Sequence, residues 1–315
     1  MLSRTADSLF WLARYVERAD NTARIIDAAS RLAAMPISYA GASNEWESAL
    51  AGAGALGAFT TAHAGPPDRD RVIDFLAFAA ENPSSIKNCL GTARHNSRAE
   101  RTALTADMWE AINAGWLELK RFDGARMDRD TLTQFLGRVK DACLLFDGSA
   151  YRTMLRNDAY FFLRLGVYLE RADSTARILD VKYHLLLPED ANVGGGLDYF
   201  QWASILRSVS SLTAYRWVYH ESLKPWLIAD LLVLNEQMPR SLASCYANLC
   251  DFLDSLSLAY GRQGPAQRVA RSIRTRLQNA SISDIFQKKG LHEFLTEFIA
   301  DNGRLGHAIT EQYLT

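Results

Sequence analysis

The chain carries one segment twice, as Tyr15-Val-Glu-Arg-Ala-Asp-Asn-Thr-Ala-Arg-Ile-Ile-Asp27 and as Tyr168-Leu-Glu-Arg-Ala-Asp-Ser-Thr-Ala-Arg-Ile-Leu-Asp180. Ten of the thirteen positions are identical and the other three are conservative changes. Apolar residues around both copies recur at helical spacing, so each copy is expected to lie on a long helix. We call these stretches the first and second E-R segments.

The repeat continues beyond the E-R segments. They lie 153 residues apart, and further identities follow at a spacing of 156: Trp46 with Trp202, Pro83 with Pro239, and Cys89 with Cys245. A change of three residues in the spacing fits one loop insertion. A repeat of this length indicates a tandem duplication. We therefore predict two helical repeats, 1–150 and 151–315, packed as one unit about a pseudo-twofold axis.

The hydrophobic pattern predicts an all-α fold, a helical bundle formed by these two halves. Strict alternation over the length of a strand is hard to find. The Ala- and Gly-rich stretch 49–58 is predicted to be a weak helix, because its counterpart in the second half is plainly helical. Helices are expected over 4–33, 44–62, 69–80, 84–121, 129–146, 155–186, 198–220, 226–235, 240–260, 265–279 and 283–313.

Composition narrows the classes of function. With 35 basic and 36 acidic residues the chain is nearly neutral, so neither nucleic acid nor an anionic membrane is expected as a partner. No run approaches the roughly 18 apolar residues of a membrane span, and the N-terminal residues lack the apolar stretch of a secretory signal. The four cysteines form no C-x-x-C pair, which favours free thiols in a reducing cytoplasm.

The charged residues of the E-R segments are the candidate site. On a helix, Glu17, Asp20 and Arg24 share one stripe, whereas Arg18 lies to one side. The acid-before-base order at i,i+4 stabilises a helix by only a few tenths of a kcal/mol, so tertiary partners are expected. The candidates for ligand binding or structural ion pairing are Glu17, Arg18, Asp20, Arg24, Glu170, Arg171, Asp173 and Arg177.

Three interpretations of these residues stay open. The first is a buried ion-pair network that locks the crossing of two helices. The second is a ligand or catalytic site built from Glu17, Arg18, Glu170 and Arg171, which requires burial to move the carboxyl pKa values apart. The third is a face that binds a partner protein.

Other chemical motifs are absent from the sequence. No His follows a Glu at the Glu-x-x-His spacing of a di-iron bundle, and H-E-x-x-H, G-x-x-x-x-G-K-[ST] and G-x-S-x-G do not occur. We therefore expect no metal and no cofactor.

The chain resembles the bacterial alpha-E domain family, helical proteins with an E-R motif. The resemblance covers nearly the whole chain, in family order. It is carried by Met1-Leu-Ser-Arg4, Tyr15-Val-Glu-Arg-Ala-Asp20, Asn82-Pro-Ser-Ser-Ile86, Met108-Trp-Glu-Ala-Ile-Asn113, Phe162-Leu-Arg-Leu-Gly166, Tyr168-Leu-Glu-Arg-Ala-Asp173 and Met238-Pro-Arg-Ser241.

The resemblance implies a cellular context. Members look like companions of circularly permuted ATP-grasp ligases and transglutaminase-like peptidases, which make and break amide bonds on peptides. The family's E-R residues correspond to Glu17, Arg18, Glu170 and Arg171. The leading hypothesis is a cytoplasmic helical subunit that assists such a ligase or presents its peptide substrate. The alternatives are an enzyme or small-ligand-binding protein that uses the Glu/Arg pairs, and a structural scaffold that forms a homo-oligomer.

Overall fold

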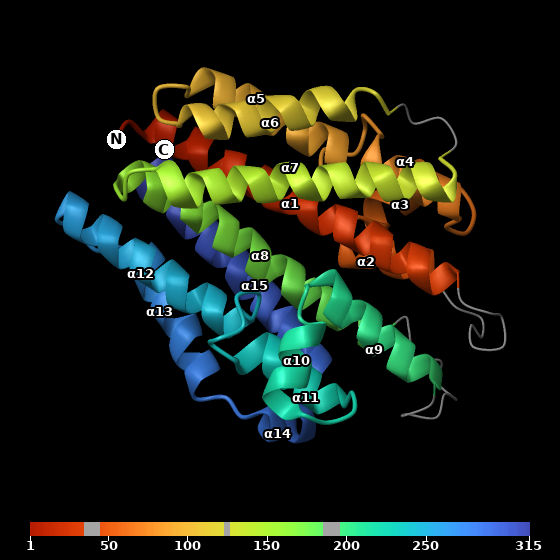
Figure 1. The fold of residues 1–315 in the computed structure, drawn as a ribbon. Coiled ribbons are helices and arrows are strands. Elements are labelled where there is room, and N and C mark those ends of the chain that lie inside the picture. Colours follow the sequence, from red (N-terminus) through yellow and green to blue (C-terminus); the bar gives the residue numbers. More distant parts are fainter. Residues whose placement is uncertain (35–44, 123–126, 185–195) are drawn as a thin grey trace.

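The computed structural model describes residues 1–34, 45–122, 127–184 and 196–315. Every regular element in these ranges is a helix, so the all-α prediction is confirmed (Figure 1). The helices are α1 (Ser3–Ala33), α2 (Glu45–Gly52), α3 (Leu56–Ala62), α4 (Arg69–Ala77), α5 (Ile86–Ala99), α6 (Ala106–Leu119), α7 (Arg129–Thr153), α8 (Asp158–His184), α9 (Gly196–Ser208), α10 (Leu212–Tyr219), α11 (Pro225–Ala229), α12 (Leu242–Tyr260), α13 (Pro265–Gln278), α14 (Ile282–Asp284) and α15 (Leu291–Ile309). Short π-helical segments follow α11, α14 and α15, over Asp230–Leu234, Ile285–Lys289 and Thr310–Leu314.

Helices α1 and α8 form the centre of the molecule, and each carries one E-R segment. They pack against each other, with α5 and α7 also against α1, and α12 and α15 against α8 (Figure 1). Leu9, Phe10, Leu12 and Ala13 are all fully buried, so α1 is covered on several sides.

The two central helices approach each other closely beside the E-R segments. A Cβ atom placed on Gly166 of α8 would clash with the carbonyl oxygen of Phe10 and lie 3.1 Å from the Cβ of Ala13. Only glycine lets the α8 backbone approach α1 so closely at this point. The approach brings the ionic side chains of both helices within reach of one another.

Burial of charge accompanies this packing. Glu17 and Asp20 are among the buried residues of α1, although most of its buried neighbours are apolar.

In the part of the chain that the structure describes, no helix is both long and apolar enough to cross a membrane.

One predicted helix, 84–121, is wrong as a single element. The structure divides it into α5 and α6 because Thr105 begins a new helix, where its side chain accepts a hydrogen bond from the Met108 N–H. Threonine favours this capping position over a helix interior. The sequence contains this capping threonine, but the helical hydrophobic pattern continues across it and therefore predicts one helix.

Three other predicted helices, 44–62, 198–220 and 283–313, are also divided, the last of them at Gly290, which has φ +89° directly before α15. Gly54 has φ +66° between α2 and α3, and Ser210 has φ +56° between α9 and α10. These left-handed conformations end a right-handed helix. The stretch 49–58 is therefore helical only in part, with a turn at its centre.

The close approach at Gly166 yields a stability prediction. Gly166→Ala should lower the free energy of unfolding by about 1–3 kcal/mol, because the added methyl group has no space. Gly148→Ala is the matched control, since a Cβ there meets no atom within 4 Å, and it should raise stability by up to about 1 kcal/mol. Urea unfolding followed by circular dichroism measures both. Equal stability of the two variants would contradict the close packing.

Candidate functional site

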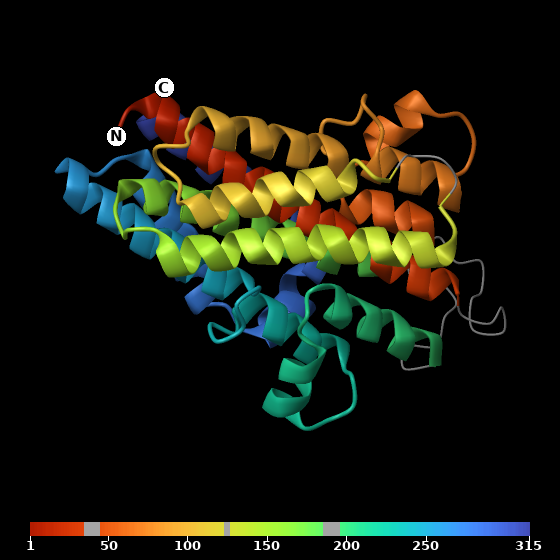
Figure 2. The same ribbon diagram turned by 45° about the horizontal axis from the view of Figure 1, so that its top comes forward.

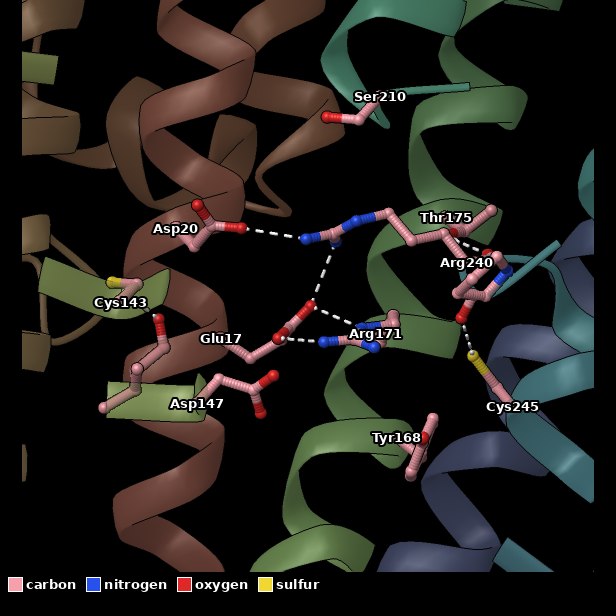
Figure 3. A network of polar contacts seen from close by, with 12 residues as sticks. Glu17, Asp20, Cys143, Asp147, Tyr168, Arg171, Thr175, Ser210, Arg240 and Cys245 are labelled. Atoms are coloured by element: carbon pink, nitrogen blue, oxygen red, sulfur yellow. Dashed lines mark hydrogen bonds and ion pairs between the residues drawn. The ribbon is translucent and has the colours of Figure 1, made fainter. Parts of the chain in front are cut away.

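The two E-R segments exchange their ion pairs. Glu17 of α1 accepts hydrogen bonds from Arg171 of α8, at 2.8 Å from Nε and 2.9 Å from Nη2 (Figure 3). Glu170 of α8 accepts from Arg18 of α1, at 2.6 Å from Nε and 3.0 Å from Nη2. The acid of each segment thus pairs with the arginine of the other segment. Two-point contact between a planar guanidinium and a carboxylate fixes both distance and orientation.

A second arginine reaches each glutamate. Arg240, just before α12, donates to Oε1 of Glu17 at 3.0 Å and to Oδ2 of Asp20 at 2.9 Å (Figure 3). Arg14 of α1 donates to Oε2 of Glu170 at 2.8 Å. Each buried glutamate is therefore held by two guanidinium groups. We call these residues the crossed network: Glu17, Glu170, Arg14, Arg18, Arg171 and Arg240.

The second arginines come from unrelated sequence positions. Arg14 corresponds to Val167, directly before the second E-R segment, and Arg240 corresponds to Ser84 in the first half. Ser84 also joins the crossed network, since its hydroxyl accepts from Nη1 of Arg18 at 3.2 Å. Sequence reasoning missed Arg14 and Arg240 because neither is repeated.

Electrostatics keep both glutamates ionised. Burial alone would raise the pKa of Glu17, but Arg171 and Arg240 outweigh it and lower the pKa to about 2. Burial opposes ionisation of Glu170 as well, and there Arg18 and Arg14 lower the pKa. In the same way, Glu17 and Glu170 raise the pKa values of Arg171 and Arg18 against the effect of burial. A carboxyl group with so low a pKa is a poor general acid or base near neutral pH.

Each of the remaining candidates forms an ion pair within its own helix, and Asp20 is bound by Arg240 as well. Arg24 donates from Nε to Asp20 at 2.8 Å, and Arg177 donates from Nε to Asp173 at 2.6 Å. Oδ1 of Asp20 is buried and makes no hydrogen bond in the described structure. All eight candidates therefore lie on α1 and α8, but only four of them form the exchanged pairs.

A small cleft borders one side of the crossed network. Its volume is about 30 Å³, and Glu17, Asp20, Asp147, Arg171 and Arg240 supply its polar lining. Space of this size holds one or two water molecules and no peptide. Neither Arg18 nor Glu170 lines it, so the four E-R residues do not converge on one open pocket.

The cysteines are not reactive groups of this site. All four are free and buried. Burial raises the pKa to about 12 for Cys89 and Cys245 and to about 11 for Cys250, and it raises the pKa of Cys143 well above its ordinary value. Thiols with such pKa values stay protonated and are weak nucleophiles. Within the described ranges, no group of three or more His, Cys, Asp or Glu side chains could hold a metal ion.

The chain matches the sequence model of a known family over almost its whole length. A sequence model described as a predicted alpha-helical domain with a conserved ER motif, that of the Alpha-E family, matches residues 1–314. The chain belongs to the Alpha-E family. Comparison with curated proteins and with solved structures gave no match. The E-R pairs of this Alpha-E chain, Glu17-Arg18 and Glu170-Arg171, are the residues that exchange partners in its interior.

The low pKa of Glu17 predicts a pH-dependent contribution to the stability of this Alpha-E protein. Because the pKa falls from an ordinary 4.5 to about 2 on folding, the stabilisation is complete above pH 4.5 and is lost as the pH falls toward 2. Between pH 5 and pH 3 the wild type should lose roughly 2 kcal/mol more free energy of unfolding than Glu17→Gln. Urea titrations at several pH values measure this difference.

The matched control is Glu110→Gln. Glu110 is exposed on α6 and forms no ion pair among the described residues, so this variant should follow the pH dependence of the wild type. If Glu17→Gln also follows the wild type, Glu17 is not held ionised by its arginines.

Proposed function

We propose that this Alpha-E chain is a helical subunit that binds the ATP-grasp amide ligase of a bacterial peptide-modifying system or presents the peptide substrate to it. Family membership and the resemblance described above support this context. A transglutaminase-like peptidase is the other expected component, and the cytoplasm is the expected location. The proposal gives the chain no catalytic role.

The crossed network is the observation that carries this proposal. Glu17 and Glu170 are 7% and 4% exposed, and four arginines occupy their oxygens. A reacting carboxylate needs access to substrate and a pKa suited to proton transfer. These two have neither, which favours a structural role for the E-R motif and leaves partner recognition to the outer surface.

We also infer that the two halves arose by duplication and are related by a local twofold axis. The exchanged pairs support this, since such an axis between α1 and α8 would interchange Glu17–Arg171 with Glu170–Arg18. Local contacts outside the E-R segments also occur in both halves. Ser85 and Ser241 each cap the helix that follows, and Cys89 and Cys245 each place Sγ 4.0 Å from the carbonyl oxygen of a preceding proline.

The surface of α10 and α11 is one place where the two halves differ. In Figure 2 this helical pair, coloured teal, projects from the rest of the molecule. It exposes Trp217 and Trp226, with exposed fractions of 78% and 47%, where the first half has Thr61 and Asp70. Tryptophan is enriched among residues that dominate binding energy at protein interfaces. We therefore assign ligase binding to this part of the surface.

Co-purification tests the proposal. The chain is co-expressed with a circularly permuted ATP-grasp ligase, the expected partner, and the complex is isolated on an affinity tag carried by the ligase. We expect stable association, a change in ligase turnover when the chain is added, and loss of both effects in Trp217→Ala. Leu258→Ala, which changes a side chain that is 85% exposed on α12, is the control and should retain both.

Other outcomes separate the alternatives. No association and no effect on turnover would contradict the proposal. Self-association of the chain that disappears in Trp217→Ala would favour the oligomeric scaffold. A Glu170→Gln variant that is as stable as the wild type but fails to support the reaction would favour the catalytic alternative.

A further inference from the structure

A second and larger cavity lies outside the crossed network. Its volume is about 390 Å³, which is within the range of small-molecule sites. It lies between the last turns of α1, the start of α2, and the first turns of α4 and α7. None of the candidate residues of the E-R segments lines it. Its lining comprises Asp27, Ser30, Arg31, Ala33, Ala34, Trp46, Arg69, Arg129, Leu132, Thr133 and Leu136.

The charged lining of this cavity is mainly basic. Arg31, Arg69 and Arg129 come from three different helices, whereas Asp27 is the one acidic residue among the described lining residues. Asp27 is already neutralised, because Arg31 holds both of its oxygens and Lys140 lies 3.1 Å away. An incoming anion would therefore meet an excess of positive charge.

The three arginines differ in how far they are already occupied. Arg31 uses Nε and Nη2 on Asp27, and Arg69 uses Nη1 on Asp70 and Nη2 on the carbonyl oxygen of Met127. The guanidinium of Arg129 makes no hydrogen bond or ion pair with any described residue. It is exposed at the start of α7, so its donors are available to a ligand.

The rest of the wall is apolar, with one additional polar group. The indole ring of Trp46 is half-buried, and the side chains of Leu132 and Leu136 are buried. The hydroxyl oxygen of Ser30 is buried and has no hydrogen-bond partner in the described structure. An aromatic ring beside guanidinium groups suits a ligand that carries both a flat or apolar body and an anionic group.

We propose that this cavity binds a small organic anion, a carboxylate or a phosphate ester with an apolar or aromatic body. Arg129 and the free Nε of Arg69 bind the anionic oxygens, and the body of the ligand packs against Trp46. Arginine recognises carboxylate and phosphate by the same two-point geometry, so the cavity fits both chemistries. The inference is independent of the proposed ligase role, since it uses neither the crossed network nor α10 and α11.

Isothermal titration calorimetry at low ionic strength tests this site. The probes are hippurate, which joins a carboxylate to a benzene ring, phenyl phosphate, and the neutral hippuramide. We expect at least one anion to bind saturably, more weakly as salt is added, and hippuramide not to bind. The anion that binds more tightly identifies the natural chemistry as carboxylate or phosphate.

Matched variants locate the binding. Arg129→Ala should weaken binding about tenfold, as expected for loss of one charge-assisted contact. Arg138→Ala removes an exposed arginine farther along the same helix and should bind as the wild type does. Trp46→Leu should weaken the binding of both ring-bearing anions, hippurate and phenyl phosphate. Failure of both anions to bind, or equal weakening by the two arginine variants, would overturn the proposal.

Discussion

The exchange of arginines between Glu17 and Glu170 is the interaction on which the centre of this molecule depends. Two carboxylates buried at a helix crossing would be costly without positive partners, since desolvation penalises each charge by several kcal/mol. Here each carboxylate receives two guanidinium groups, one of them from the opposite E-R segment. Because the contacts are two-point, they restrict sliding and rotation of α1 against α8 as well as their separation.

The exchange also explains why a charged motif lies at the centre of an apolar bundle. Apolar contacts alone tolerate several helix registers, whereas a fixed pair of acids and arginines accepts few. Gly166 completes the arrangement by letting the backbones approach where the ionic side chains meet. On this account the E-R motif of this chain fixes how α1 packs against α8.

Much of this arrangement was predictable from the sequence. The repeat identified the two central helices, helical spacing gave the all-α class, and the i,i+4 order gave the pairs Asp20–Arg24 and Asp173–Arg177. A helical wheel shows which face a side chain occupies, but it cannot name the residue on the neighbouring helix. The exchange of arginines between the two E-R segments could therefore be identified only from the structure.

The unpredicted features have different physical causes. Arg14 and Arg240 complete the crossed network from positions that are not repeated, so comparison of the halves pointed away from them. The breaks at Gly54 and Ser210 depend on single left-handed residues within helical patterns. The cavity around Arg129 is formed by helices far apart in the chain, and only the fold brings its three arginines together.

A double-mutant cycle on Glu17 and Arg171 tests the central claim most directly. Unfolding free energies are measured for the wild type, Glu17→Gln, Arg171→Met and the double variant, with a second cycle on the exposed pair Asp254–Arg271 as the reference. The account predicts a coupling energy of about 2 kcal/mol or more for the buried pair, although Arg240 still contacts Glu17, and under about 1 kcal/mol for the exposed pair. Additive effects of Glu17→Gln and Arg171→Met, within about 0.5 kcal/mol, would contradict it.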